Sequence, residues 1–165
     1  PGATYTVPTE DQWFKAAYYK GSGTSAGYWN YATRSDTIPG KVTSGTTGVG
    51  SRPDGTGDFA NFASTASWNS LTGNVTTVGT NGGPSAYGAF DMTGNLWEWT
   101  SGTAGSGAVL WARGAAWDSA DNPNPMSSAF SRTNIATTTQ VNTVGFRLVS
   151  VPEPSTYALT AMCTL

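Results

Sequence analysis

The chain has 165 residues, of which 38% are hydrophobic and only 11% are charged, and its formal net charge is −2. This length fits one domain, and seven Trp, seven Tyr and six Phe exclude a disordered chain because they supply large side chains to bury. The low charge and the lack of a basic run exclude nucleic acid as a partner, and the lack of histidine removes most zinc, non-haem iron and Ser-His chemistry from this segment.

The first predicted element is a helix over Glu10–Lys20. Thr9 precedes two acidic residues and Gln12, which is the spacing of a capping box, and the acidic residues suit the positive end of the helix dipole. Apolar residues then recur at helical spacing. We expect Trp13 and Ala17 to pack on the core.

The stretch from Gly21 to Pro84 is rich in Gly, Ser, Thr and Asn and has no clean period and no internal repeat. This composition predicts turns and short strands. A flexible linker is the alternative for Thr43–Gly57. Aromatic residues on either side, at 28–31 and 59–62, favour a region that is tied down as a whole.

Three strands are predicted in the second half, at Ala89–Thr100, Val109–Trp117 and Val144–Val149. In the first of them Trp97 and Trp99 alternate with polar residues, so both indoles are expected on one face. We interpret these two tryptophans and Trp117 as core residues. An exposed aromatic platform for a sugar is the alternative role for one of them.

The last segment differs from the rest of the chain. It contains Pro152 and Pro154, which fit an extended linker, and ends in nine apolar-rich residues, Tyr157–Leu165. A membrane helix needs about 20 residues. Because the chain also begins at Pro1 without a methionine, we expect a fragment that is cut at both ends.

Five motifs, in order, resemble those of the formylglycine-generating enzyme (sulfatase-modifying factor) family and together cover residues 5–149. They are P-T-E-D-Q-W-F-K-A-A at 8–17, A-N-F at 60–62, Y-G-A-F-D-M-T-G-N-L-W-E-W-T at 87–100, R-G-A-A-W at 113–117 and G-F-R-L at 145–148. The resemblance implies a C-type-lectin-like α+β fold with short twisted sheets, few helices and much irregular loop. It assigns residues 1–149 to an N-terminally truncated domain of this family.

Residues 150–165 resemble a C-terminally truncated PEP-CTERM sorting tail, through Val-Pro-Glu-Pro-Ser-Thr at 151–156. This resemblance implies an exported protein of the cell envelope, cell surface or extracellular matrix of a Gram-negative bacterium. Its partner would be an exosortase-type sorting machinery. The protein would meet the membrane only through this tail.

The family's enzymes bind copper through two cysteines that follow the R-G-G-S-W motif. The matching segment here, Asp118–Asn124, has no cysteine, and the single Cys163 lies in the tail. A related branch holds iron with histidines, which are absent. We therefore expect no copper, no iron and no catalysis by this segment, unless residues outside it supply metal ligands. A carboxylate pair of Asp118 and Asp121 is better explained by turn chemistry than by hydrolysis.

The resemblance also implies a structural calcium, bound by the side chains of Asp91 and Glu98 and the carbonyl groups of Gly94 and Leu96. Calcium prefers such oxygen ligands. Asn61 matches a ligand of a second calcium site of the family, whose acidic ligand has no counterpart at 68–74.

The alternative without calcium is that Asp91 caps a turn and Glu98 pairs with an arginine. Arg113 and Arg147 are the two candidates for that partner.

These observations favour a non-catalytic binding module on the family's scaffold, because loops on a rigid scaffold commonly bind. Its binding face is predicted within 117–142, and its ligand is a glycan, a peptide or a partner protein. The candidate ligand-binding residues are Trp117, Asp118, Asp121, Asn122, Asn124, Phe130, Arg132 and Asn134. A metal-dependent oxidase or oxygenase and a structural extracellular-matrix component are the alternative functions.

Overall fold

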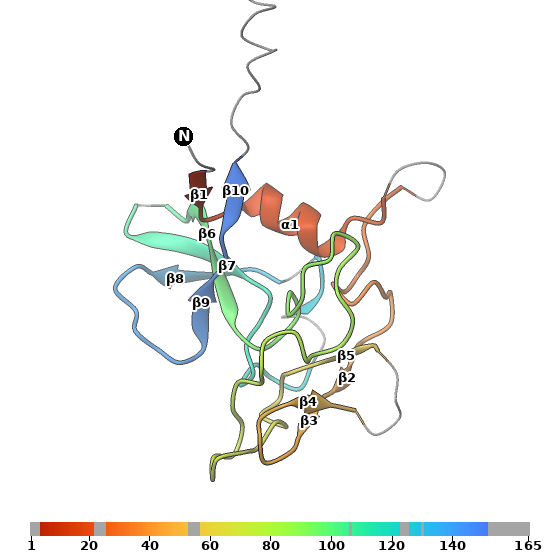
Figure 1. Ribbon diagram of the computed structural model, residues 1–165. Coiled ribbons are helices and arrows are strands. Elements are labelled where there is room, and N and C mark those ends of the chain that lie inside the picture. Colours follow the sequence, from red (N-terminus) through yellow and green to blue (C-terminus); the bar gives the residue numbers. More distant parts are fainter. Residues whose placement is uncertain are drawn as a thin grey trace, which may run out of the picture.

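The computed structural model describes residues 4–21, 26–52, 57–105, 107–122, 126–129 and 131–151. The described residues form one helix and several short strands with much irregular chain between them, which confirms the predicted α+β class (Figure 1). The elements are β1 (Thr4–Thr6), α1 (Glu10–Tyr18), β2 (Gly40–Lys41), β3 (Thr43–Ser44), β4 (Gly50–Ser51), β5 (Phe59–Ala60), β6 (Trp97–Thr103), β7 (Val109–Arg113), β8 (Thr133–Ala136), β9 (Val144–Phe146) and β10 (Val149–Val151).

The largest sheet has the strand order β8-β7-β6-β9. Its β6–β7 and β7–β8 pairs are antiparallel, whereas β9 runs parallel to β6. The first and last described strands, β1 and β10, pair antiparallel and lie beside the start of α1 (Figure 1). The predicted boundary between domain and tail at 149/150 therefore falls inside β10, and residues 152–165 lie outside the described residues.

Helix α1 confirms the capping box. The backbone N–H of Gln12 donates to Thr9 Oγ1 at 3.2 Å, and the backbone N–H of Thr9 donates to Gln12 Oε1 at 2.9 Å. The helix ends at Tyr18, two residues before the predicted end, because Tyr19 takes an extended conformation and forms a backbone bridge with Tyr28. Within the described residues no helix has the length and apolar character needed to cross a membrane.

The three strands predicted in the second half are shorter than expected or divided. Residues 89–96 form a loop, and β6 starts only at Trp97. Strand β7 ends at Arg113 because Gly114 and Ala115 both take positive φ angles, of 101° and 67°. Residues 147–148 separate β9 from β10, so the third predicted strand contributes to two different sheets.

The glycine-rich middle region contains two small ladders, the parallel pair β2–β5 and the antiparallel pair β3–β4. The described part of Thr43–Gly57 thus includes paired strands, which contradicts the flexible-linker alternative there. Most of the remaining region is irregular, as its composition predicts.

The core consists of two clusters of buried side chains. The first joins Trp13, Ala17 and Tyr18 of α1 to Ala32 and Met92, and the second contains Tyr31, Ala60, Phe62, Ala115 and Met126. Trp13 and Ala17 are buried as predicted. The predicted core residues Trp97, Trp99 and Trp117 are only partly buried. For Trp97 and Trp99 the reason is that β6 turns the alternate side chains Glu98 and Thr100 inward.

Candidate functional site

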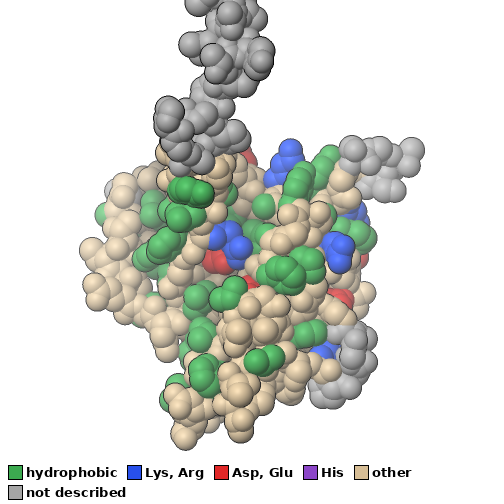
Figure 2. All heavy atoms as spheres, in the orientation of Figure 1, with side chains coloured by type: hydrophobic (Ala, Val, Ile, Leu, Met, Phe, Trp, Pro, Cys, Tyr) green, Lys and Arg blue, Asp and Glu red, His purple; other side chains and the backbone are tan. Residues whose placement is uncertain are grey.

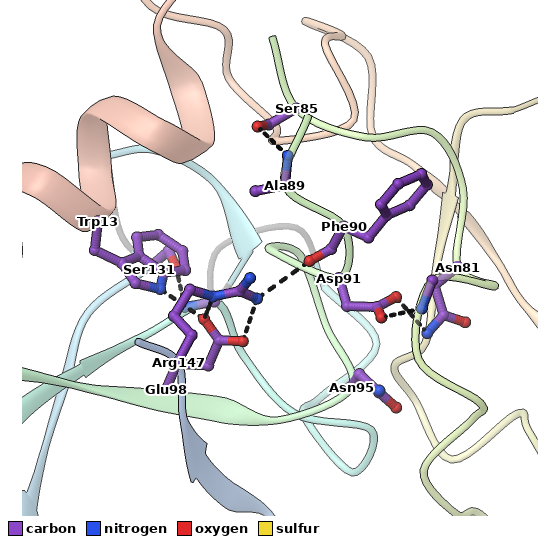
Figure 3. Close-up of polar contacts among 12 residues, drawn as sticks. Trp13, Asn81, Ser85, Ala89, Phe90, Asp91, Asn95, Glu98, Ser131 and Arg147 are labelled. Carbon is purple, nitrogen blue, oxygen red and sulfur yellow. Dashed lines mark hydrogen bonds and ion pairs between the residues drawn. The ribbon is translucent and has the colours of Figure 1, made fainter. Parts of the chain in front are cut away.

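A buried ion pair connects β6 with the residue that follows β9. Arg147 donates to both carboxylate oxygens of Glu98, and its Nη2 donates to the carbonyl oxygen of Phe90 at 3.1 Å. The indole Nε1 of Trp13 donates to Glu98 Oε2 at 2.6 Å (Figure 3). This one carboxylate therefore connects the helix, the central strand and the segment after β9.

The other contacts of Arg113 explain why Arg147 rather than Arg113 pairs with Glu98. Glu98 lies opposite Arg113 on β7 and opposite Gly145 on β9, so both arginines are near it. Arg113 instead donates to Glu10 Oε1, with a shortest distance of 2.7 Å, and to the carbonyl oxygen of Ser131 at 3.1 Å. With Arg113 bonded there, Arg147 is the arginine that neutralises Glu98.

Burial raises the pKa of Glu98, because it disfavours the charged carboxylate. Hydrogen bonds from Arg147 and Trp13 oppose this rise, and the nearby Asp91 adds to it. The shift is upward because burial dominates. Arg147 and Trp13 thus offset part of the free energy needed to bury Glu98 as an anion.

Asp91 organises the turn that precedes β6. Its carboxylate accepts hydrogen bonds from the backbone N–H of Gly79 at 2.6 Å and from Asn81 Nδ2 at 3.0 Å (Figure 3). Asp91 itself has a positive φ of 56°, and Gly94 and Asn95 have φ angles of 75° and 68°. The predicted positive φ angles of the Gly-Asn turn are confirmed.

The motif residues surround a cavity of about 230 Å³, which we call the Glu98 cavity. Figure 2 shows a basic and an acidic side chain side by side near the centre of one molecular face, with hydrophobic side chains around them. The lining residues of the Glu98 cavity are Val78, Phe90, Asp91, Asn95, Leu96, Glu98, Phe146 and Arg147. Of the four predicted calcium ligands, Asp91, Leu96 and Glu98 line the cavity. Gly94 does not line it, and its carbonyl oxygen accepts the backbone N–H of Leu96 at 2.9 Å.

The donor set fits a calcium ion only if Arg147 releases Glu98 and the Asp91 carboxylate turns from its contacts with Gly79 and Asn81. The guanidinium of Arg147 already holds both Glu98 oxygens, and the described residues contain no group of three or more His, Cys, Asp or Glu side chains that could hold a metal. The alternative, in which Asp91 caps a turn and Glu98 pairs with an arginine, describes the contacts that are present. Calcium at this site stays a prediction.

We expect calcium and Arg147 to compete for Glu98. After treatment with a chelator, added calcium should raise the melting temperature of both proteins, and the rise should be several-fold larger for Arg147→Gln than for the wild type. The reason is that the neutral glutamine no longer forms the ion pair with Glu98, which leaves both carboxylate oxygens free to bind calcium. Differential scanning calorimetry with and without calcium measures this. The matched variant Glu98→Gln should abolish most of the rise, and an equal or absent rise in all three proteins would refute the site.

Asn61, the residue of the second predicted calcium site, is fully buried. Its Nδ2 donates to the carbonyl oxygen of Asn74 at 2.8 Å and to Asn95 Oδ1 at 3.0 Å. Its Oδ1 has no hydrogen-bond partner within the described part of the chain. Asn61 thus joins the middle region to the Gly-Asn turn, and its role as a calcium ligand stays a prediction.

Two of the predicted ligand-binding residues, Asp121 and Asn122, line a second cavity of about 300 Å³, which we call the Asp121 cavity. The remaining lining residues are Ile38, Pro39, Gly40, Lys41 and Phe62. Lys41 and Asp121 form an exposed ion pair at this cavity. The residues at 38–41 were not predicted, because they belong to no motif and reach Asp121 only through tertiary contacts.

The other predicted ligand-binding residues lie elsewhere. Trp117 Nε1 donates to the carbonyl oxygen of Asn142 at 3.3 Å, and the exposed Asp118 follows it in the same loop. Arg132 stacks on the Trp111 ring at 3.5 Å and pairs with Glu10 at 3.1 Å.

Asn134 lies on β8, opposite Trp111, and does not line the Asp121 cavity. Asn124 and Phe130 lie outside the described residues. The structure thus divides the described part of the predicted face among the Asp121 cavity, the loop that follows β7 and the region of β8.

Comparison with known proteins supports the resemblance stated for the motifs. The profile of the Sulfatase-modifying factor enzyme 1-like domain matches residues 2–151. No curated protein sequence matches the chain.

Several solved structures are similar in fold. Treponema denticola variable protein 1 has a TM-score of 0.58 and 20% identity, over 90% of this chain and 48% of that one. CarF has a TM-score of 0.56 and 20% identity, over 90% of this chain and 48% of that one. PvdO from Pseudomonas aeruginosa has a TM-score of 0.53 and 19% identity, over 90% of this chain and 53% of that one. The chain therefore spans about half the length of these proteins.

Proposed function

Because the chain belongs to the Sulfatase-modifying factor enzyme 1-like domain family, we propose that it is a non-catalytic module that binds a peptide segment of a partner protein in the Asp121 cavity. The observation that carries this proposal is the cavity itself. It occupies the loop position where the resemblance places the catalytic cysteines of the enzymes, and Asp121 and Asn122 stand there instead. A thiolate is the ligand that soft copper prefers, so these residues favour binding over oxidation.

The lining of the Asp121 cavity favours a peptide over a sugar. Ile38 is 51% exposed and offers an aliphatic surface, while Phe62, the aromatic residue of the lining, is only 2% exposed. A sugar ring stacks on an exposed aromatic face, which this cavity does not offer in its described lining. An aliphatic wall beside the opposite charges of Lys41 and Asp121 suits an apolar side chain and a flanking polar group of a peptide.

We also propose that the module acts outside the cell. The tail motif at 151–156 supports export and handling by an exosortase-type machinery, which would deliver the domain to the cell surface or to an extracellular matrix. Binding of a partner protein there is compatible with a structural contribution to the matrix. Altered biofilm cohesion after loss of the gene, restored equally by the wild type and by Ile38→Ser, would favour the structural role.

The Asp121 cavity should select peptides from a random phage-displayed library. For the enriched peptides, Ile38→Ser should weaken binding by about tenfold, because it removes apolar contact area. Biolayer interferometry with synthetic copies of these peptides measures the dissociation constants. Val141 is exposed to the same extent as Ile38, at 51%, and does not line the cavity, so Val141→Ser is the matched control and should bind like the wild type.

Two results would contradict the proposal. Peptides that bind wild type and Ile38→Ser equally would place the binding site elsewhere. Failure to enrich any peptide, combined with glycan binding that Ile38→Ser weakens, would assign the cavity to a sugar. Metal analysis of the full-length protein addresses catalysis separately. Copper or iron at one per chain would overturn the non-catalytic assignment and favour the oxidase or oxygenase alternative.

A further inference from the structure

A shallow groove of about 310 Å³ runs beside the exposed side of α1, away from the residues of the Asp121 cavity. We call it the Tyr87 groove, and its lining residues are Gln12, Lys15, Ala16 and Tyr87. We propose that the Tyr87 groove binds an acidic polysaccharide, with sugar rings stacked on tyrosine and a carboxylate at Lys15. This site is independent of the peptide site proposed above.

Aromatic rings continue from the Tyr87 groove across the surface. Tyr87 stacks on Tyr19 with ring centroids 6.2 Å apart and an angle of 22° between the rings. Tyr19 lies 5.7 Å from Tyr28, which in turn lies 4.9 Å from Phe14. Tyr87 and Tyr28 are 55% and 49% exposed, so ring surface remains open to a ligand. This array is the exposed platform that the half-buried tryptophans of β6 do not provide.

Lys15 gives the groove a positive charge. Its ammonium group lies 5.5 Å from the centre of the Tyr19 ring, and within the described part of the chain it forms no ion pair. Other lysines do pair, Lys20 with Asp36 and Lys41 with Asp121. An unpaired cation beside aromatic rings complements a ligand that carries carboxylates among its sugar rings.

Gln12 adds a hydrogen-bond donor to the Tyr87 groove. Its Oε1 accepts the backbone N–H of Thr9 in the capping box, which fixes the side chain and leaves the amide nitrogen as a donor for a hydroxyl group. A groove with aromatic faces, one cation and one amide donor has the mixed character of a sugar site. A purely apolar surface would instead favour protein association.

The loop that carries Tyr87 is held in place before a ligand binds. Ser85 Oγ accepts the backbone N–H groups of Tyr87 and Ala89, both at 3.3 Å, and the backbone N–H of Gly88 donates to the carbonyl oxygen of Ser85 at 2.9 Å. Figure 3 shows the contact between Ser85 and Ala89. Because the loop is ordered beforehand, binding loses little conformational entropy at Tyr87.

The test is binding of the whole 165-residue chain to immobilised alginate oligomers, which are chains of uronic acids, measured by biolayer interferometry. Tyr87→Ala should weaken binding by about tenfold through lost stacking. Lys15→Gln should weaken it by about fivefold at low ionic strength and by less at physiological ionic strength, because salt screens the exposed charge. Tyr5 is an exposed tyrosine of β1 outside the aromatic array, so Tyr5→Ala is the matched control and should bind like the wild type.

Other probes separate this proposal from its rivals. Dextran, which is neutral, and poly-glutamate, which lacks sugar rings, should both bind at least tenfold more weakly than alginate. Poly-glutamate binding as strong as alginate binding would show that charge alone is recognised, and equal dextran binding would remove the role of Lys15. Loss of alginate binding in Tyr5→Ala, or no alginate binding by the wild type, would overturn the proposal. Because Ile38→Ser leaves the Tyr87 groove intact, its alginate binding should equal that of the wild type.

Discussion

Replacing Gly94 with alanine is expected to lower the free energy of unfolding by about 3–5 kcal/mol, as measured by urea denaturation. A Cβ atom at Gly94 would lie 2.4 Å from the backbone carbonyl oxygen of Asn61. The two segments cannot separate freely, because Gly94 N donates to the carbonyl oxygen of Gly114 at 2.6 Å and Asn95 N donates to that of Asn61 at 2.8 Å. The added methyl group therefore forces apart three segments that meet at the Gly-Asn turn.

Gly88 supplies a matched control for the backbone angle. Its φ of 79° is close to the 75° of Gly94, but a Cβ atom there would meet nothing within 4 Å. Gly88→Ala should therefore show the strain of the positive φ alone, about 1–2 kcal/mol. Equal losses of unfolding free energy in Gly94→Ala and Gly88→Ala would contradict the close approach of Gly94 to Asn61.

Replacing Glu98 with alanine is expected to lower the free energy of unfolding by about 3 kcal/mol. The change leaves Trp13 Nε1 buried without its acceptor and leaves Arg147 without its partner. The loss is large because the Glu98 side chain is only 10% exposed. Arg147, at 26%, can still reach solvent, which keeps the loss at the lower end of the range for buried pairs. Urea denaturation of wild type and variant measures the difference.

The exposed pair of Lys41 and Asp121 is the control for this prediction. Its side chains are 41% and 63% exposed, so Asp121→Ala should change stability by less than about 1 kcal/mol. The loss of unfolding free energy in Glu98→Gln should fall between those of Glu98→Ala and Asp121→Ala. The amide oxygen can still accept the hydrogen bond of the Trp13 indole, while the charge is lost. A Glu98→Ala variant as stable as Asp121→Ala would contradict the conclusion that Glu98 stabilises the fold by connecting α1, β6 and the segment after β9.

Local sequence signals predicted local structure well. The capping box of Thr9 and Gln12 and the positive φ angles of Gly94 and Asn95 depend on residues a few positions apart, and both are confirmed. Element ends were predicted less well. Helix α1 stops at Tyr18 because Tyr19 pairs with Tyr28, which is a contact that periodicity does not encode.

The candidate sites show the same division. The motif at 87–100 contains Asp91, Leu96 and Glu98, which line the Glu98 cavity, but the sequence left two arginines open as partners of Glu98. The Asp121 cavity was found only in part, because Ile38 and Lys41 belong to no motif. The Tyr87 groove was not predicted at all, since Lys15 and Tyr87 are far apart in the chain and come together only in the folded domain.

The sequence by itself determined the family, the α+β class, the helix start and the turn before β6, because these follow from ordered motifs and from interactions between near neighbours. Only the tertiary structure decided which arginine neutralises Glu98, which residues accompany Asp121, and which aromatic rings remain exposed. The physical reason is that these outcomes depend on strand register and on contacts between distant segments. Arg113 binds Glu10 and thereby leaves Glu98 to Arg147, a competition that no single stretch of the chain contains.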